Sequence, residues 1–211
     1  MKVLVTGAGS LLLGGVAAAL HARGDEVVVL QRRTVSFAGS DDVQQVLADV
    51  RDQAAVQRAA TGCDAIVHGA AKVGVVGTWT DFESVNVQGA ANVLHAARAA
   101  GVSRVVHVST PSVAHSGSSI VGAGADRAVV GRRSAYYAES KAIAEQAALQ
   151  ANSDDLGVVA IRPPDGQRGP GRPKSRLEAF ARLRLRHALS KPKLAQGPAQ
   201  LFRQGLQLQL E

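Results

Sequence analysis

Short runs of apolar residues alternate with longer alanine-rich segments along residues 1–162 of this 211-residue chain. We expect the short runs to be strands, and they cover residues 2–6, 26–30, 43–48, 64–68, 104–109 and 156–161. Most of them are continuous apolar runs rather than alternations of apolar and polar residues, which is typical of strands covered on both faces. The pattern therefore favours a buried sheet of parallel strands.

The segments between these runs have the spacing of helices, which we expect at about 11–23, 52–60, 81–100 and 134–151. In the third, apolar residues recur at spacings of three and four. Gly24 and Gly101 stand where a helix can end in a left-handed residue. Alternation of strands and helices means right-handed crossovers, so the sequence predicts an α/β fold with a doubly wound, parallel, Rossmann-like sheet.

The pattern changes after Arg162. Residues 163–211 are rich in proline, glycine, arginine and glutamine, and no further clear buried strand occurs there. Residues 1–162 carry 14 basic and 14 acidic side chains, whereas residues 163–211 carry 10 and 3, so the formal charge of +7 belongs to this segment. We expect an NAD(P)-binding domain over residues 1–162 and an irregular basic tail over residues 163–211. A balanced domain argues against specific nucleic-acid binding.

Composition limits the remaining classes of protein. Only 3% of residues are aromatic, so the core must be built from alanine, valine and leucine. The single cysteine, Cys63, excludes an internal disulfide and favours a reducing compartment, and we expect a cytoplasmic protein. No apolar run approaches the roughly 20 residues of a membrane span. The histidines and Cys63 form no metal-binding motif, so we expect no metal site.

The first strand runs into a glycine-rich turn, VTGAGSLLLGG (5–15), that opens a helix. Backbone N–H groups at such a helix start can bind the pyrophosphate of a dinucleotide. The residues expected to bind it are Gly7, Gly9, Ser10, Leu11 and Leu12. A tight turn without a ligand is the alternative.

The second and third strands end in residues that bear on cofactor choice. An NAD site usually has a carboxylate at the end of the second strand, where this chain has Gln31, Arg32 and Arg33. The two arginines suit the 2′-phosphate of NADP, so NADP is slightly favoured over NAD, and a solvated basic loop is the alternative. After the third strand, Asp49 could accept from an adenine amino group, whereas we expect Asp52 to be a helix N-cap.

The fourth strand ends in small residues. Ala70 and Ala71, followed by Lys72, would let a cofactor lie close to the backbone. Asn86 falls on the apolar face of the next helix, and a buried amide must find partners. It could tie the helix to a neighbouring strand, or it could support an active-site lysine through water.

Both tyrosines of the chain occur in YYAESK, where Tyr137 and Lys141 are four residues apart and share a helix face. A free phenol has a pKa of about 10, and a neighbouring ammonium lowers it. The pair can therefore donate and accept a proton. Thr110, beside Ser109 at the end of the fifth strand, would orient a substrate oxygen, and Tyr136 would be a packing partner. An ordinary surface helix is the alternative.

The order of these motifs resembles the extended short-chain dehydrogenase/reductase family. The closest likeness is to the 3β-hydroxysteroid dehydrogenase branch, among the NAD-dependent epimerases and dehydratases. The segments that carry it are VTGAG, HGAAKVGVVGTWTDFESVNVQGAANVL, VVHVSTPSV and YYAESKAIAE. The resemblance implies hydride transfer at a secondary alcohol or ketone of a small-molecule substrate, either sterol-like or a nucleotide sugar. A homodimer is one assembly compatible with it.

The resemblance also implies residue roles. Tyr137 would be the catalytic acid/base, and Lys141 would lower its pKa and bind the nicotinamide ribose. Thr110 would match the catalytic Ser/Thr, with Ser109 beside it. Asn86 would match the helix asparagine of the family. Asp49, followed by Val50, would match its adenine-contacting aspartate.

Two departures from the family pattern stand out. The family reads T-G-x-x-G-x-x-G, and here Ser10 and Leu13 occupy the last two glycine positions, with Gly14 just beyond. We expect Leu13 to push the helix away from the sheet or the pyrophosphate, unless the turn slips by one residue. In addition, the ending after residue 162 looks truncated or out of frame. A genuine short variant is one alternative, and a catalytically impaired nucleotide-binding protein or fragment without the substrate domain is another.

Overall fold

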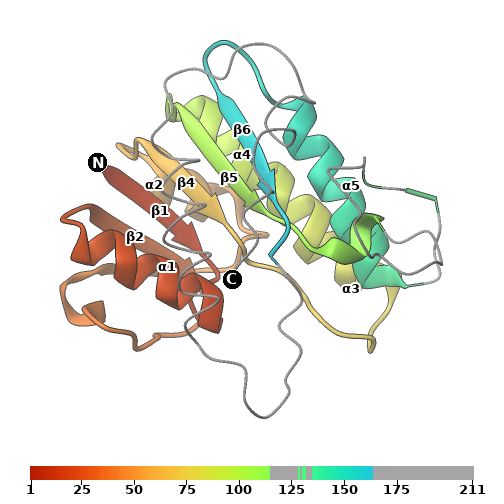
Figure 1. Ribbon diagram of the computed structural model, residues 1–211, viewed down its shortest axis with the longest axis horizontal. Helices are drawn as coiled ribbons and strands as arrows, with labels where there is room; N and C mark the ends of the chain where they lie inside the picture. The colour runs from red at the N-terminus through yellow and green to blue at the C-terminus, as the bar shows by residue number, and fades with distance from the viewer. Residues whose placement is uncertain (115–127, 129, 132–134, 164–211) are drawn as a thin grey trace, which may run out of the picture.

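The computed structural model describes residues 1–114, 128, 130–131 and 135–163. The expected basic tail lies outside the described residues from position 164 on. Six parallel strands form one sheet in the order β3-β2-β1-β4-β5-β6 (Figure 1). They are β1 (Lys2–Thr6), β2 (Glu26–Gln31), β3 (Gln44–Leu47), β4 (Ala65–His68), β5 (Arg104–Val108) and β6 (Gly157–Ile161). The predicted strands and their parallel, Rossmann-like arrangement are confirmed.

The predicted helices are confirmed with adjusted bounds. They are α1 (Leu11–Ala22), α2 (Gln53–Ala60), α3 (Trp79–Phe82), α4 (Gly89–Ala99) and α5 (Tyr136–Gln150). A π-helical segment, η2 (Glu83–Gln88), joins α3 to α4, so the region expected to be one helix contains a wider turn. Short 3-10 turns are η1 (Ser40–Asp42) and η3 (Pro111–Ala114). Gly24 and Gly101 have φ of 88° and 67°, as their places at helix ends predicted.

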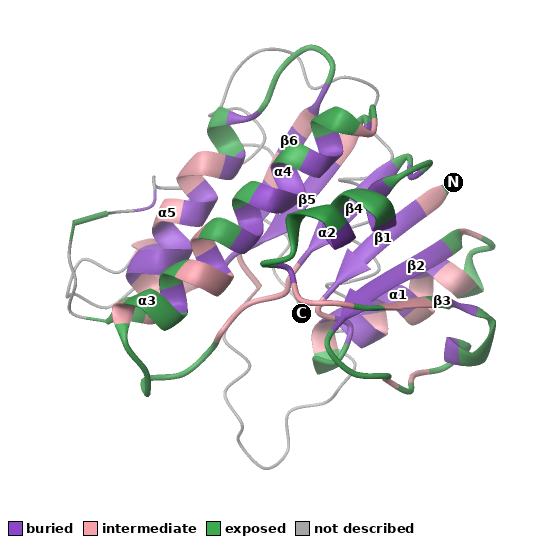
Figure 2. Ribbon diagram, turned by 180° about the vertical axis from the view of Figure 1, so that it is seen from behind, coloured by how far each residue is buried: buried purple, intermediate pink, exposed green. Residues whose placement is uncertain are grey.

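The two faces of the sheet are covered differently. Among the described residues, α1 packs on one face, with Val3, Val5 and Val16 in its core. Helices α2, α4 and α5 pack on the other face, where Leu4 and Ile66 lie beneath them. Figure 2, seen from behind, shows these three helices in front of the sheet with their buried sides turned toward it. Side chains of successive strand residues therefore alternate between two apolar layers.

Local sequence explains where the helices begin. The side chain of Asp52 accepts from the N–H of Ala55 at 3.0 Å, which confirms the predicted N-cap of α2. A capping box of Thr78 and Asp81 starts α3.

Cys63 is buried before β4, where its thiol lies 3.4 Å from the carbonyl of Ala59. Across the described ranges, no helix is long and apolar enough to cross a bilayer.

Candidate active site

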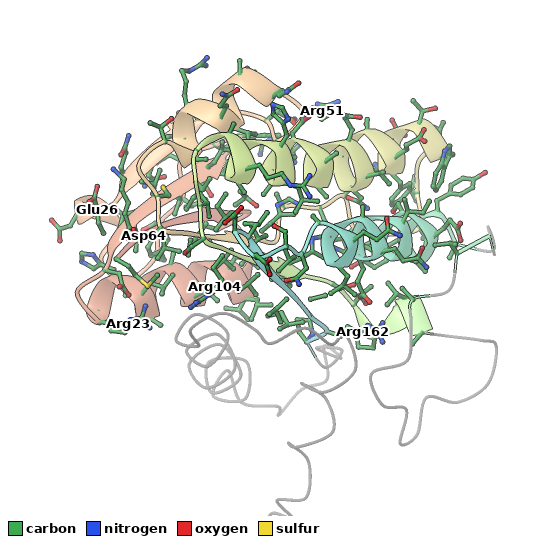
Figure 3. All side chains as sticks on the ribbon, turned by 90° about the horizontal axis from the view of Figure 1, so that it is seen from above. Arg23, Glu26, Arg51, Asp64, Arg104 and Arg162 are labelled. Carbon is green, nitrogen blue, oxygen red and sulfur yellow. The ribbon has the colours of Figure 1, made fainter. Side chains whose placement is uncertain are left out.

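The candidate site lies along the edge where the parallel strands end. The strand order reverses between β1 and β4, and open α/β sheets bind ligands at the carboxyl ends of strands beside such a point. In Figure 3, Arg162, which follows β6, marks this end of the sheet, whereas Glu26 and Asp64 lie at the opposite end. The sequence-predicted residues come from the segments that leave this edge.

The glycine-rich turn is packed directly on the end of β4. Gly7 has a φ of +83°, and a Cβ there would lie 2.7 Å from the backbone nitrogen of Ala70. The hydroxyl of Thr6 accepts from the N–H groups of Gly69 and Ala70, at 3.2 Å each. Only glycine satisfies both the left-handed backbone and this close approach.

Leu13 is accommodated by two glycines. Its side chain is buried, and it fills the space beside Gly69, where a Cβ would lie 2.7 Å from Leu13 Cδ2. One residue later, a Cβ on Gly14 would lie 2.9 Å from the carbonyl oxygen of Ala8. Leu13 therefore does not push α1 from the sheet, because α1 stays packed against β1 and β2 with Leu13 in its core.

The residues around the turn fit a dinucleotide. Ser10 is the N-cap of α1 and accepts from Leu13, so the N–H groups of Leu11 and Leu12 are the donors that this helix end offers to an anion. At the end of β2, Gln31 Oε1 is buried and has no hydrogen-bond partner among the described residues. A buried acceptor of this kind suits a hydroxyl donor, such as that of the adenosine ribose.

The orientation of the Gln31 amide is fixed by its neighbours. The backbone N–H of Val35 donates to Gln45 Oε1 at 3.0 Å, and Gln45 Nε2 donates back to the carbonyl of Val35 at 3.0 Å. Gln45 therefore presents an oxygen to Gln31, whose Nε2 donates to it at 3.1 Å. The remaining Gln31 oxygen must face away from Gln45. A ligand at this point meets an uncharged acceptor rather than the usual carboxylate.

Asp49 already has a cationic partner. Arg51 donates to both carboxylate oxygens through Nε and Nη2, at 3.0 and 2.8 Å, and through its backbone N–H. These hydrogen bonds hold the pKa of Asp49 below its ordinary value, and the charge of Arg32 adds to the effect. An adenine amino group would therefore share this carboxylate with Arg51. The next residue, Val50, is buried against α4, where a Cβ on Gly89 would lie 2.8 Å from Val50 Cγ2.

Asn86 ties the π-helical segment to the start of α5. Its Oδ1 accepts from the N–H of Lys72 at 2.7 Å, and its Nδ2 donates to the carbonyl of Lys72 at 3.0 Å. The same Nδ2 donates to the hydroxyl of Ser140 at 2.9 Å, which in turn donates to the carbonyl of Tyr137. Asn86 therefore ties the segment after β4 to the start of α5.

Lys141 is buried under α5 rather than extended into solvent. Only 3% of the residue is exposed. Its ammonium donates to the carbonyl of Val108 at 2.7 Å and lies 3.4 Å from His107 Nε2. Burial lowers the pKa of Lys141 to about 8, and the charge of Glu145 opposes that change. Glu145 is itself held by Arg162, at 2.6 and 3.0 Å. Lys141 therefore loses its proton at a lower pH than an ordinary lysine does.

The hydroxyl residues lie where β5 ends. The hydroxyl of Ser109 is buried without a hydrogen-bond partner in the described part of the chain. Thr110 Oγ1 lies 3.3 Å from Ser112 Oγ and accepts from the N–H of Ser112, also at 3.3 Å. The turn that follows, η3, packs against α5, which carries Tyr137 one helical turn before Lys141. The fold thus brings the predicted catalytic residues to one corner of the sheet.

Tyr136 and Tyr137 differ in their surroundings. Tyr136 is exposed, and its ring packs edge-on to Trp79 and near Phe82, with centroid distances of 6.0 and 6.3 Å. Tyr137 is half-buried and shares its helix face with Lys141. The contacts of the first ring agree with a packing role for Tyr136, and the acid/base role of Tyr137 stays a prediction.

Several polar residues at this edge were not anticipated from the sequence. They are Thr6, His68, His107 and Ser140. Each is buried and hydrogen-bonded to a residue far away in the sequence or to a backbone group. A weak signal was available, since the two histidines occupy equivalent places near the ends of consecutive strands.

The sequence matches the model of the NAD dependent epimerase/dehydratase family over residues 3–208. It is 41% identical over 165 residues to a 2-alkyl-3-oxoalkanoate reductase of Stenotrophomonas maltophilia, covering 77% of this chain and 50% of that protein. It is 31% identical to a 3-beta-hydroxysteroid dehydrogenase of Mycolicibacterium neoaurum over 77% of this chain and 46% of that one. The chain thus spans about half the length of these curated relatives.

Solved structures are similar in fold. The UDP-glucose 4-epimerase of Thermus thermophilus, in complex with NAD, superposes with a TM-score of 0.64 and 31% identity. The match covers 77% of this chain and 54% of that one.

Proposed function

Because the chain belongs to the NAD-dependent epimerase/dehydratase family, we propose that it is an oxidoreductase that interconverts a secondary alcohol and a ketone with NAD or NADP. The observation that carries this proposal is the buried ammonium of Lys141, one turn after Tyr137 at the ligand-binding edge of the sheet. A structural surface helix would not bury a lysine there, because burying a charge is costly.

The residues would divide the reaction as follows. The nicotinamide ring would supply or take up the hydride. Tyr137 would give its phenolic proton to the carbonyl oxygen during reduction and take it back during oxidation, which Lys141 assists by favouring the phenolate. The hydroxyls of Thr110 and Ser109 would hydrogen-bond the same oxygen. The buried hydroxyl of Ser109, without a partner among the described residues, supports this, since a substrate oxygen would satisfy it.

An apolar rim beside the site favours an apolar substrate over a nucleotide sugar. We define this rim by the exposed side chains of Val73, Val75 and Val76. Val75 is 94% exposed and Val76 82%. The rim lies between Lys72 and α3. Lys72 is hydrogen-bonded to Asn86, and Trp79 of α3 packs on Tyr136. Exposed apolar groups next to a site commonly contact ligand, whereas a sugar would need polar partners.

A substrate panel tests the proposal. The full chain would be mixed with NADH or NADPH and long-chain 3-oxo acids or 3-oxosteroids, which are ketones, and with NAD⁺ or NADP⁺ and UDP-sugars, which are alcohols. The absorbance of the reduced nicotinamide would be followed, and conversion of the UDP-sugars would be measured by chromatography. We expect turnover with an apolar ketone and none with the sugars. Turnover of a UDP-sugar alone would contradict the substrate assignment. Dinucleotide binding with no turnover across the panel would favour a nucleotide-binding protein without catalysis.

We further propose that Arg32 and Arg33 bind the 2′-phosphate of NADP. Both are exposed after β2. The positive charge of Arg32 helps to lower the pKa of Asp49, so Arg32 lies on the side of the site where adenosine would bind. Gln31 adds an acceptor there without a negative charge that would repel a phosphate.

The double substitution of Arg32 and Arg33 by alanine is expected to weaken NADPH binding by at least about tenfold and to leave NADH binding unchanged. Calorimetric titration with each dinucleotide would measure this. Arg58→Ala, which removes an exposed arginine from α2, is the matched control. Equal weakening of both dinucleotides in the double variant would contradict a 2′-phosphate site.

A further inference from the structure

Three polar side chains form one row across the sheet, at the level where β1, β4 and β5 end. Thr6 pairs in register with His68, and His68 pairs with His107. All three residues are at most 2% exposed. They point to the face covered by α4 and α5, because the residues two positions earlier on each strand belong to the core beneath those helices. Lys141 packs at the His107 end of the row.

The hydrogen bonds of Thr6 determine the tautomer of His68. The hydroxyl oxygen of Thr6 accepts from two backbone N–H groups, so its single proton is free to be donated elsewhere. His68 Nδ1 lies 2.7 Å from that oxygen and must be the acceptor. His68 therefore carries its proton on Nε2. Burial, reinforced by the charge of Lys141, lowers the pKa of His68 to about 3, so the ring is neutral at physiological pH.

His107 has the opposite tautomer. An ammonium has three donors and no acceptor, so the contact between Lys141 Nζ and His107 Nε2 requires an unprotonated Nε2. The proton of the neutral ring is then on Nδ1. The pKa of His107 lies well below its ordinary value. Burial is the main cause, and the charge of Lys141 and the neighbouring His68 add to it. The two imidazoles lie with centroids 5.4 Å apart.

We propose that His107 is a positioning residue, whose Nε2 holds the Lys141 ammonium against the end of β5. The carbonyl of Val108 accepts the second N–H of that ammonium. The third N–H then remains for the open side of the site, where the proposed function places the nicotinamide ribose and the phenol of Tyr137. This last step rests on the proposed function, whereas the contact between Lys141 and His107 does not.

The other described groups around Lys141 do not offer its ammonium a side-chain acceptor, so His107 takes that role. Glu145 on α5, whose charge acts on Lys141, is engaged in two hydrogen bonds with Arg162. On the sheet side, His68 is occupied by Thr6, and Val108 offers only its carbonyl. Among the described residues that bond to the ammonium, His107 is the only side chain. A neutral acceptor stabilises the cation without pairing its charge, so the ammonium can still act on the phenol.

A first measurement needs neither cofactor nor substrate. The ¹⁵N chemical shifts of His107 in the folded wild-type chain report its tautomer. We expect Nε2 to be unprotonated and Nδ1 to be protonated at neutral pH. A proton on Nε2 would overturn the proposal, and this outcome does not depend on the folding of any variant.

A second measurement follows the titration of Lys141 by NMR in the cofactor-free protein. In His107→Leu we expect the proton affinity of Lys141 to fall about tenfold, since one charge-assisted hydrogen bond is lost. His107→Gln, which keeps an acceptor, should restore most of it. His95→Leu, at an exposed position on α4, is the matched control. Identical titration in wild type and His107→Leu would overturn the proposal.

The active enzyme offers a third readout. In His107→Leu, Lys141 should lose its proton at lower pH, so the alkaline limb of the pH profile of kcat/KM should move to lower pH. In His107→Gln the limb should return toward wild type. An unmoved profile in His107→Leu would overturn the link to the phenol. If no ketone is turned over, the proposed function fails, but the tautomer and the Lys141 titration still decide the role of His107.

Discussion

Tyr137→Phe is expected to lower kcat for ketone reduction by about a thousandfold, within the range that general acid–base catalysis contributes. The substitution removes one hydroxyl and keeps the ring. The hydrogen bond that Ser140 donates at this position goes to the backbone carbonyl, so phenylalanine preserves it. The anchoring of α5 by Asn86 should therefore survive, and so should the dinucleotide site.

Tyr136→Phe is the matched control for this prediction. It removes a hydroxyl from the adjacent residue, whose ring contributes packing against Trp79 and Phe82. We expect its kcat to stay close to wild type. Dinucleotide affinity, measured by calorimetry, should be unchanged in both variants. Similar activity of the two variants would show that the phenol of Tyr137 does not take part in proton transfer.

Local patterns were sufficient for the fold. Continuous apolar runs such as residues 26–30 and 104–109 predicted buried parallel strands, because only strands covered on both faces need side chains of this kind in succession. Asp52 could be recognised as an N-cap, since a cap is made within one helical turn. The spacing of Tyr137 and Lys141 likewise fixed a shared helix face.

Contacts between distant segments could not be predicted in this way. Whether Leu13 fits depends on Gly69, which meets it only when β1 and β4 are neighbours. The pairing of His68 with His107 depends on the register between two strands. The free oxygen of Gln31 is set by Gln45 on another strand. In each case the chemistry follows from strand order and register, which a spacing rule does not contain.

Lys141→Met is expected to abolish most turnover and to remove a pH dependence of stability. The unfolded chain has a lysine pKa of 10.5, and burial lowers it to about 8 in the folded chain. Below about pH 8 both states carry the proton, so the cost of burying the cation is fully present. Between about 8 and 10.5 the folded state releases its proton first, and stability rises with pH. Above that window the cost is gone.

The size of this effect follows from the two pKa values. Their separation corresponds to about 3 kcal/mol, gained by wild type across the window and absent from the methionine variant. Methionine matches the length of the lysine stem but leaves the acceptors of Val108 and His107 without a donor, at about 1–3 kcal/mol each. The difference in pH dependence is therefore a sharper test than the stability at any single pH.

Urea unfolding of wild type and Lys141→Met at several pH values between 7 and 10.5 would measure this difference in the pH dependence of stability. Ionisable groups away from residue 141 are common to both proteins, so their contributions cancel in the comparison. Lys2→Met is the control, because it removes a lysine near the surface that forms an ion pair with Glu26. Parallel curves for wild type and Lys141→Met would mean that the ammonium is solvated in the native state. The proposed loosening of the Tyr137 proton by a buried charge would then lose its physical basis.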